Sequence, residues 1–158
     1  MKYRCLSNEE LAELEGEFKH FLISNNVYTE EWVDLNKKKD KKVQELVELF
    51  SDIVLDKALK NIQFLEHLTP NDIKAFKCEH DKMTLIGVAS ENKNIDFTKD
   101  TLADFADELD IFKTSKPYNK ERELEVFELL QSGCSIIDEA RFKKLELAHG
   151  YSTKQMKN

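Results

Sequence analysis

The apolar residues of this chain follow helical spacing in most segments and an alternating, strand-like spacing in one stretch. That stretch, residues 62–89, reads IQFLEHLTPNDIKAFKCEHDKMTLIGVA, and turn signals at 69–72 and 80–82 divide it into three apolar runs. Pro, Asn and Asp favour tight turns, and short turns make neighbouring strands antiparallel. The pattern therefore predicts a three-stranded antiparallel meander with strands over 62–68, 73–79 and 83–89.

Two details of the meander depend on its first turn. A four-residue connection at 69–72 would place His67 opposite Lys74 on the neighbouring strand. Residues 70–75 also fit one helical turn ahead of a shorter strand, so this alternative stays open.

Three helices are predicted before the meander. Ser7 and Glu10 have capping-box spacing, in which the hydroxyl and the carboxylate each accept a backbone amide at the helix start. Apolar residues then recur at helical spacing as far as Ser24. The helix is expected to end at Asn25-Asn26, because Asn tolerates the left-handed backbone of a helix stop.

A short second helix is expected to begin at Thr29, a good capping residue, with Trp32 and Leu35 buried. The longest helical pattern begins at Val43 and ends near residues 59–61, and its apolar face is broad. A broad face indicates packing on two sides, so we place this helix at the centre of the core.

Helical patterns also follow the meander, separated by one extended segment. Capping residues mark the helix starts, and glycines mark two of the helix ends. The predicted elements are a helix over 99–109 capped by Thr98, an extended segment over 110–116, a helix from Asn119 to Gly133, and a helix from Asp138 to Gly150.

These elements predict an α+β fold that is mainly helical, with a small three-stranded antiparallel meander at about 62–89 flanked by N-terminal and C-terminal helices. A chain of 158 residues is close to the usual size of one domain. We expect a single α+β domain over residues 1–150 and a polar C-terminal tail over 151–158.

Charge narrows the range of partners. Lys and Arg number 24 and Asp and Glu 31, which gives a formal net charge of −7. An acidic surface disfavours nonspecific attraction to phosphate backbones, so nucleic-acid binding is not expected. The run NKKKDKK at 36–42 has no interleaved aromatic residue, which favours a solvated corner between helices over a polyanion contact.

Cysteine usage and hydropathy bear on location. Three widely spaced cysteines, Cys5, Cys78 and Cys134, form no CxxC pair and fit reduced thiols in the cytosol. No apolar run approaches the ~20 residues of a membrane span, and the N-terminal residues lack the apolar core of a signal peptide. A cytoplasmic protein without membrane attachment is expected.

Cys78, His80 and His67 come closest to a metal-ligand set. Thiolate and imidazole suit zinc, and Cys78 and His80 would share one face of a strand. The expected register, however, puts His67 and His80 at opposite ends of the middle strand, ~20 Å apart. A buried structural cysteine and turn-exposed histidines are therefore favoured, and neither a metal site nor a cofactor is predicted.

The second candidate site is the start of the helix near Asn119. Hydroxyls, cations and free backbone amides at a helix N-terminus form a sound anion site. The glycines of a P-loop are missing, and helix capping with solvated cations is the competing interpretation. The residues that could bind an anion here are Thr114, Ser115, Lys116, Lys120 and Arg122.

Three segments carry a resemblance to a known family. They read MKYRCLSNEEL, FLEHLTPNDIKAFKCEHDKMTLIGV and TSKPYNKERELEVFELLQSG, and together they span most of the chain. The chain resembles a family of uncharacterised single-domain proteins, a domain of unknown function, from flavobacteria and related Bacteroidetes. The resemblance implies a bacterial, cytoplasmic, single-domain protein and implies no activity.

Function is predicted only as a class. No nucleophile context such as G-x-S-x-G occurs, so no catalytic residue is predicted. A compact acidic domain without a catalytic signature favours a protein-interaction or regulatory module that binds a protein partner or self-associates. The alternative is an anion- or nucleotide-binding enzyme that uses the helix start at 114–122.

Overall fold

The structure is a computed structural model that describes residues 1–156. Its contacts divide the chain into two compact units, Met1–Leu59 and Lys60–Asn158, and each unit is considered by itself. None of the helices in the described part of the chain is both long and apolar enough to cross a membrane.

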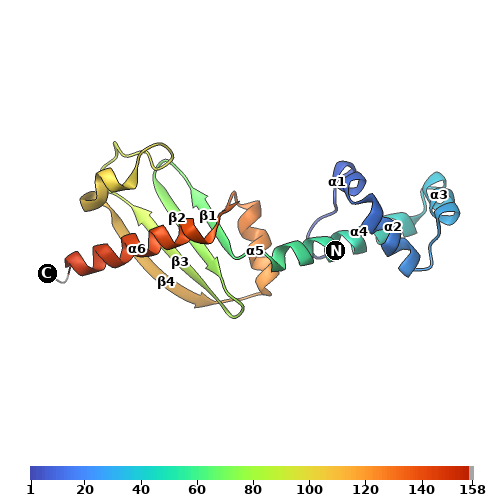
Figure 1. The fold of residues 1–158 in the computed structure, drawn as a ribbon. Helices are drawn as coiled ribbons and strands as arrows, with labels where there is room; N and C mark the ends of the chain where they lie inside the picture. Colours follow the sequence, from blue (N-terminus) through green and yellow to red (C-terminus); the bar gives the residue numbers. More distant parts are fainter. Residues whose placement is uncertain (157–158) are drawn as a thin grey trace. The chain divides into compact units, whose positions relative to one another are not determined.

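The first unit is built from helices (Figure 1). The capping box of Ser7 and Glu10 is present, which confirms the predicted start of the first helix. The single helix expected as far as Ser24 is wrong, because the backbone at Leu14 leaves the helical region and splits it in two. The four helices are α1 (Asn8–Glu13), α2 (Glu15–Ser24), α3 (Thr29–Lys37) and α4 (Lys41–Lys60).

Two of the predicted helix boundaries in this unit are confirmed by the backbone. Asn26 ends α2 with a φ of 61°, in the left-handed region that Asn tolerates. The lysine-rich run forms the expected corner between α3 and α4, where Lys39 has a φ of 51°. Thr29 does not cap α3, because the cap position is Tyr28 and no side chain bonds the first amides.

A small apolar cluster holds the first unit together. Its buried members are Leu22, Val27 and Leu46, and Trp32 and Leu35, which were predicted to be buried, are partly buried against them. The placement of α4 at the centre of the core is wrong, because the apolar cluster that packs the sheet consists of residues beyond 60 and includes none from α4. Only part of the broad apolar face of α4 is covered in the structure.

The N-terminal segment is bound along α4 by polar contacts. Ser51, which is fully buried, accepts the amide of Leu6 at 2.9 Å and donates to the carbonyl of Val47 at 2.6 Å. The Asp52 carboxylate accepts the amide of Lys2 at 2.8 Å. An extended segment with no ladder of its own thereby satisfies its backbone donors through helix side chains.

The second unit contains one antiparallel sheet with strand order β4-β3-β2-β1-β5. The three predicted strands are confirmed to within two residues, and His67 does pair with Lys74. The alternative helical turn at 70–75 is wrong, because a strand begins at Asp72. The strands are β1 (Phe64–Leu68), β2 (Asp72–Cys78), β3 (Lys82–Ala89), β4 (Asp110–Pro117) and β5 (Ser135–Ile136).

The predicted number of strands is therefore wrong, and the reason differs for the two strands that were missed. The extended segment 110–116 is β4, but its mainly polar residues gave no apolar alternation that would join it to the meander. The strand β5 has two residues, too few to show any period. The fold class, α+β, is confirmed.

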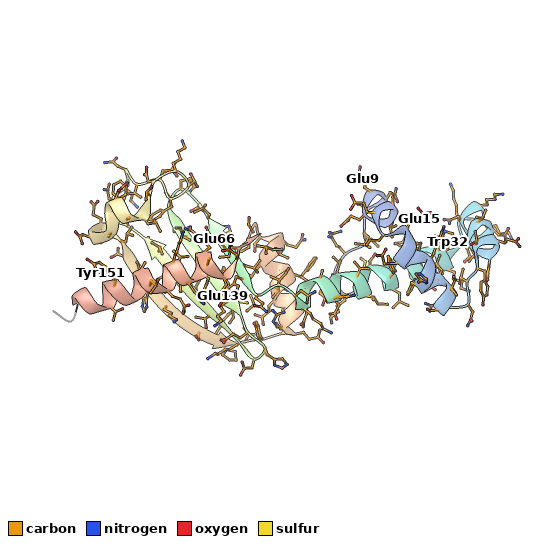
Figure 2. All side chains as sticks on the ribbon, viewed as in Figure 1. Glu9, Glu15, Trp32, Glu66, Glu139 and Tyr151 are labelled. Carbon is orange, nitrogen blue, oxygen red and sulfur yellow. The ribbon has the colours of Figure 1, made fainter. Side chains whose placement is uncertain are left out.

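Helix α6 (Glu139–Met156) lies across one face of the sheet (Figure 1). Asp138 caps it by accepting the amide of Arg141 at 2.9 Å, as predicted. Beneath α6, the buried carboxylate of Glu66 (Figure 2) accepts two bonds from the Arg141 guanidinium, at 2.9 and 3.2 Å. The core on this face contains Phe64, Ile73, Ala75, Ile86, Val88, Ile95, Phe97, Phe142 and Leu145.

The remaining connections include two departures from the sequence prediction. The α-helix expected over 99–109 is a 3-10 helix, η1 (Leu102–Glu108), with a kink at Phe105. Helix α5 (Arg122–Gln131) ends as predicted, with Gly133 at a φ of 106°. The end predicted at Gly150 is wrong, because α6 continues through it to Met156, so much of the predicted tail 151–158 is helical.

Candidate functional site

The residues predicted to bind an anion lie on β4 and at the start of α5. Thr114, Ser115 and Lys116 belong to β4, and the Ser115 hydroxyl lies 2.9 Å from that of Thr84 on β3. The Lys116 ammonium lies 3.9 Å from the Glu125 carboxylate. The other two predicted residues, which are considered next, lie beyond the strand.

Lys120 and Arg122 are both engaged by groups of the protein. The Lys120 ammonium contacts the Glu128 carboxylate at 2.5 Å, and this bond raises the pKa of Lys120. Arg122 donates to the carbonyls of Ile62, of Cys78 at 3.0 Å and of Glu79 at 3.2 Å, with its side chain only 12% exposed. Arg122 is therefore a clamp that binds the end of the β2–β3 hairpin to the start of α5.

Acidic residues dominate the start of α5. Its cap position is Glu121, and Glu123 and Glu125 follow in the first turn. Carboxylates are favourable partners of a helix N-terminus, and they repel a second anion. The anion site remains a prediction, and two of its cations, Lys120 and Arg122, are already bound to a carboxylate and to carbonyls.

The structure brings Arg122 close to the other candidate cluster. A cavity of about 540 Å³ is lined by residues that include Lys77, Cys78, His80 and Arg122. Burial raises the pKa of the Cys78 thiol to about 11, so at neutral pH it is protonated and a poor nucleophile. His67 lies elsewhere, beside Gly133. Within residues 1–156, no three His, Cys, Asp or Glu side chains are grouped as a metal site.

An exposed feature of the second unit is the β4 edge, defined as the backbone of Asp110–Pro117 on the side away from β3. In the part of the chain that the structure describes, β4 is the outermost strand on its side of the sheet (Figure 1). Seven of its eight residues are exposed. This is a long edge compared with β5, the two-residue strand at the other side.

The ladder pattern shows which groups of the β4 edge point outward. The amide of Glu79 donates to the carbonyl of Lys82 at 3.0 Å, so this pair is hydrogen-bonded. Backbone bonding switches sides from one residue to the next along an antiparallel strand. Along β3, every second residue from Lys82 onward therefore bonds to β2, and the residues between them bond to β4. The β3–β4 register then directs the backbone of Ile111, Lys113 and Ser115 away from β3. Pro117 occupies the next outward position, where it has no amide hydrogen.

An apolar groove lies beside the start of the β4 edge, between η1 and α6. A cavity of about 650 Å³ there is lined by Leu109, Ile111, Leu145 and Tyr151, among others. Tyr151 lies on the last part of α6 (Figure 2), and its side chain is 54% exposed. A strand placed along β4 could direct a side chain into this groove.

Charge changes sign along the β4 edge. Asp110 stands at its start, next to Asp107 and Glu108 at the end of η1. Lys113 stands at its centre, where it contacts Glu146 of α6 at 3.0 Å, and Lys116 stands near its end. The edge therefore has an acidic end and a basic end.

Sequence reasoning did not identify the β4 edge as a site. Ile, Phe and Thr in the run DIFKTSKP favour a strand, and the terminal Pro favours an edge position. That run thus contained a signal for an edge strand. Its neighbour in the sheet could not be read from the sequence, because 20 residues separate it from β3.

Comparisons with known proteins address the family of this chain. Neither the curated proteins nor the solved structures contain a significant match to it. The profile of a family of unknown function, DUF6495, matches residues 1–149. This match confirms that the chain resembles a family of unknown function, and the chain belongs to that family.

Proposed function

We propose that this protein is a non-catalytic interaction module that binds a protein partner by strand addition at the β4 edge. The observation that carries the proposal is the outward-directed backbone of Ile111, Lys113 and Ser115 on an exposed outer strand. In strand addition, main-chain hydrogen bonds give affinity and alternate side chains give specificity.

The apolar groove supports this mode of binding. Specificity in strand addition comes from pockets for alternate side chains of the added strand. The groove includes Ile111, an outward-bonding residue of β4, together with Leu109 and Tyr151. An added strand that bonds to Ile111 would have its neighbouring side chains at the mouth of this groove.

The residues that usually protect an edge are present but cover it only in part. Edge strands avoid wrong pairing by means of Lys, Pro or bulges. Pro117 removes one outward amide, and it stands at the very end of the strand. The side chain of Lys113 bonds to Glu146 on α6, so it does not cover the backbone amide and carbonyl of Lys113. The protection therefore limits the length of pairing without preventing it.

The chemistry of the second unit supports a non-catalytic role. The Cys78 thiol is protonated at neutral pH because burial raises its pKa. Arg122, the most buried of the predicted anion-binding cations, bonds to three carbonyls of its own chain. Neither group is arranged as a nucleophile or as an oxyanion donor.

A paired substitution at residue 113 tests the proposal. Lys113→Pro removes the outward amide at the centre of the β4 edge, a position where an edge strand tolerates Pro. Lys113→Ala removes the same ammonium and its bond to Glu146 but keeps the amide. The difference in peptide binding between the two variants therefore measures the contribution of the backbone amide of residue 113.

The measurement is selection of extended peptides from a displayed random library on the full chain, followed by titration of the selected peptides. We expect peptides that bind the wild type and Lys113→Ala alike and bind Lys113→Pro about tenfold or more weakly. Circular dichroism establishes that both variants are folded. Peptides that bind Lys113→Pro as well as the wild type, or a selection that yields none, would refute the proposal.

A further inference from the structure

We infer that the partner strand at the β4 edge is β4 of a second copy of this chain, running antiparallel to the first. This inference rests on the proposed function, since it names the occupant of the same edge. Its basis is the change of charge along β4, from Asp110 at one end to Lys116 at the other. A copy rotated by a two-fold axis reverses this order, so that each acidic end meets a basic end.

One register satisfies both the backbone and the charges. Outward-bonding residues must pair with each other, which places the two-fold axis at Lys113 and pairs Ile111 with Ser115 of the second copy. Asp110 then stands opposite Lys116, and the symmetry repeats this pair. Directly opposed, oppositely charged side chains stabilise a strand pair, and these positions are the closer, non-hydrogen-bonded ones.

The neighbouring registers lose these charge pairs. A shift of two residues in one direction places Asp110 opposite Thr114, a neutral residue. A shift in the other direction places Ile111 opposite Pro117, which lacks the amide for a bonded pair. A parallel arrangement would put like charges side by side. The Lys113-centred register is thus the one that the charges of β4 select.

The side chains that would form the opposed pairs are exposed. Lys116 is 60% exposed and only 3.9 Å from Glu125, a weak contact of the kind that contributes little at a surface. The two Lys113 side chains at the axis are each held by Glu146 at 3.0 Å, which offsets their mutual repulsion. Phe112, which is 50% exposed, lies opposite Thr114 of the second copy and gains cover from it.

Sedimentation equilibrium of the full chain at low salt tests the inference. We expect a mass of twice 18.5 kDa for the wild type and for Lys113→Ala, and the mass of one chain for Lys113→Pro. Asp110→Lys and Lys116→Asp each turn two attractive pairs into two repulsive ones. Each variant alone should dimerise about tenfold or more weakly than the wild type.

Mixing the two charge variants provides the decisive control. In a heterodimer of Asp110→Lys with Lys116→Asp, both opposed pairs are again attractive. We expect the mixture, and the double variant carrying both changes, to regain the wild-type mass. Recovery would also show that neither single variant had simply failed to fold.

The outcomes separate this inference from the proposed function. A wild type that stays monomeric, a dimer that survives Lys113→Pro, or a mixture that stays monomeric would each overturn the β4–β4 pairing. The peptide selection above is done on chain diluted until it is monomeric, so that it reads the binding of a foreign strand to an unoccupied Lys113 amide and is separate from these results. Peptides that require the Lys113 amide, found with a monomeric chain, would keep the proposed function and reject the second copy as partner.

Discussion

The phenyl ring of Phe112 lies over Gly87, its direct partner across the β3–β4 ladder, and fills the space in which a Cβ at residue 87 would stand. Glycine leaves a gap on a sheet face, and an aromatic side chain from the next strand can cover it. The contact between Phe112 and Gly87 therefore holds β4 against β3 without a contribution from α6. It also keeps half of the Phe112 ring at the surface of the sheet.

The first prediction concerns this pair. Gly87→Ala forces the Phe112 ring away from β3, and overpacking of this kind costs about 1–3 kcal/mol of unfolding free energy. Urea denaturation of the full chain measures the change. The same substitution in a Phe112→Ala background should cost clearly less, and an equal cost in both backgrounds would contradict the role given to the ring.

The second prediction concerns the Arg122 clamp. Arg122→Ala removes bonds from a charged donor to three carbonyls, and we expect a loss of about 2–3 kcal/mol in unfolding free energy. Arg122→Lys should recover only part of it, because an ammonium lacks the fork of the guanidinium. Lys120→Ala, which removes an exposed ion pair, is the matched control and should change little.

Thermal melting in the presence of phosphate tests the anion-binding prediction. If inorganic phosphate binds at the start of α5, it should raise the melting temperature of the wild type, and the gain should vanish in Lys116→Ala. We expect no such gain, because Lys120 and Arg122 are engaged by a carboxylate and by carbonyls, and the first turn of α5 is acidic. A phosphate-dependent rise that needs Lys116 would restore the anion site as the leading candidate.

The third prediction is a pH dependence in the first unit. The Arg4 guanidinium, which bonds Glu10 at 2.8 Å, lowers the pKa of Glu10 from 4.5 to about 2, with help from the Ser7 amide. A carboxyl whose pKa is lowered by folding stabilises the fold above its unfolded pKa. That stabilisation is lost as the pH falls from 4.5 towards 2.

Thermal unfolding of Glu10→Gln beside the wild type measures this effect. The wild type should melt at the higher temperature near neutral pH, and the gap should narrow as the pH falls through this window. The matched control is Glu15→Gln, which removes an exposed pair with Lys19. A gap that stays constant with pH would contradict the Arg4–Glu10 contact.

The fourth prediction concerns the cysteines. Burial raises the pKa of Cys78 to about 11 and also raises the pKa of Cys134, whereas Cys5 is partly exposed. Thiolates are the reactive form, so iodoacetamide should modify Cys5 about tenfold or more faster than the other two. Peptide mass spectrometry over time measures the rates. Fast labelling of Cys78 in the folded chain would contradict its burial.

Local signals in the sequence were enough to predict the meander and several helix boundaries. The turn residues at 69–72 and 80–82 fix two hairpins and, with them, the pairing of His67 with Lys74. Asn26 and Gly133 mark helix ends because the backbone there needs a positive φ. Gly150 has no such φ in the structure, so its presence alone gave a false helix end.

What the sequence left undetermined depends on contacts between distant residues. The edge position of β4 is set by its pairing with β3 across an intervening loop and a 3-10 helix. The Arg122 clamp joins carbonyls more than 40 positions away, which no local pattern reveals. The candidate anion site stays a prediction, and the carboxylates and carbonyls that bind Lys120 and Arg122 could not be read from the sequence.

The two-residue length of β5 has a consequence for aggregation. Fibrils of stacked strands grow only when both edges of a sheet can accept a further strand. Here one rim offers β4, and the opposite rim ends in Ser135–Ile136, which pairs with only two residues of β1. Addition of strands at β4 would thus stop after a single pairing event. The sheet can therefore pair at one edge, and its short opposite edge disfavours polymerisation.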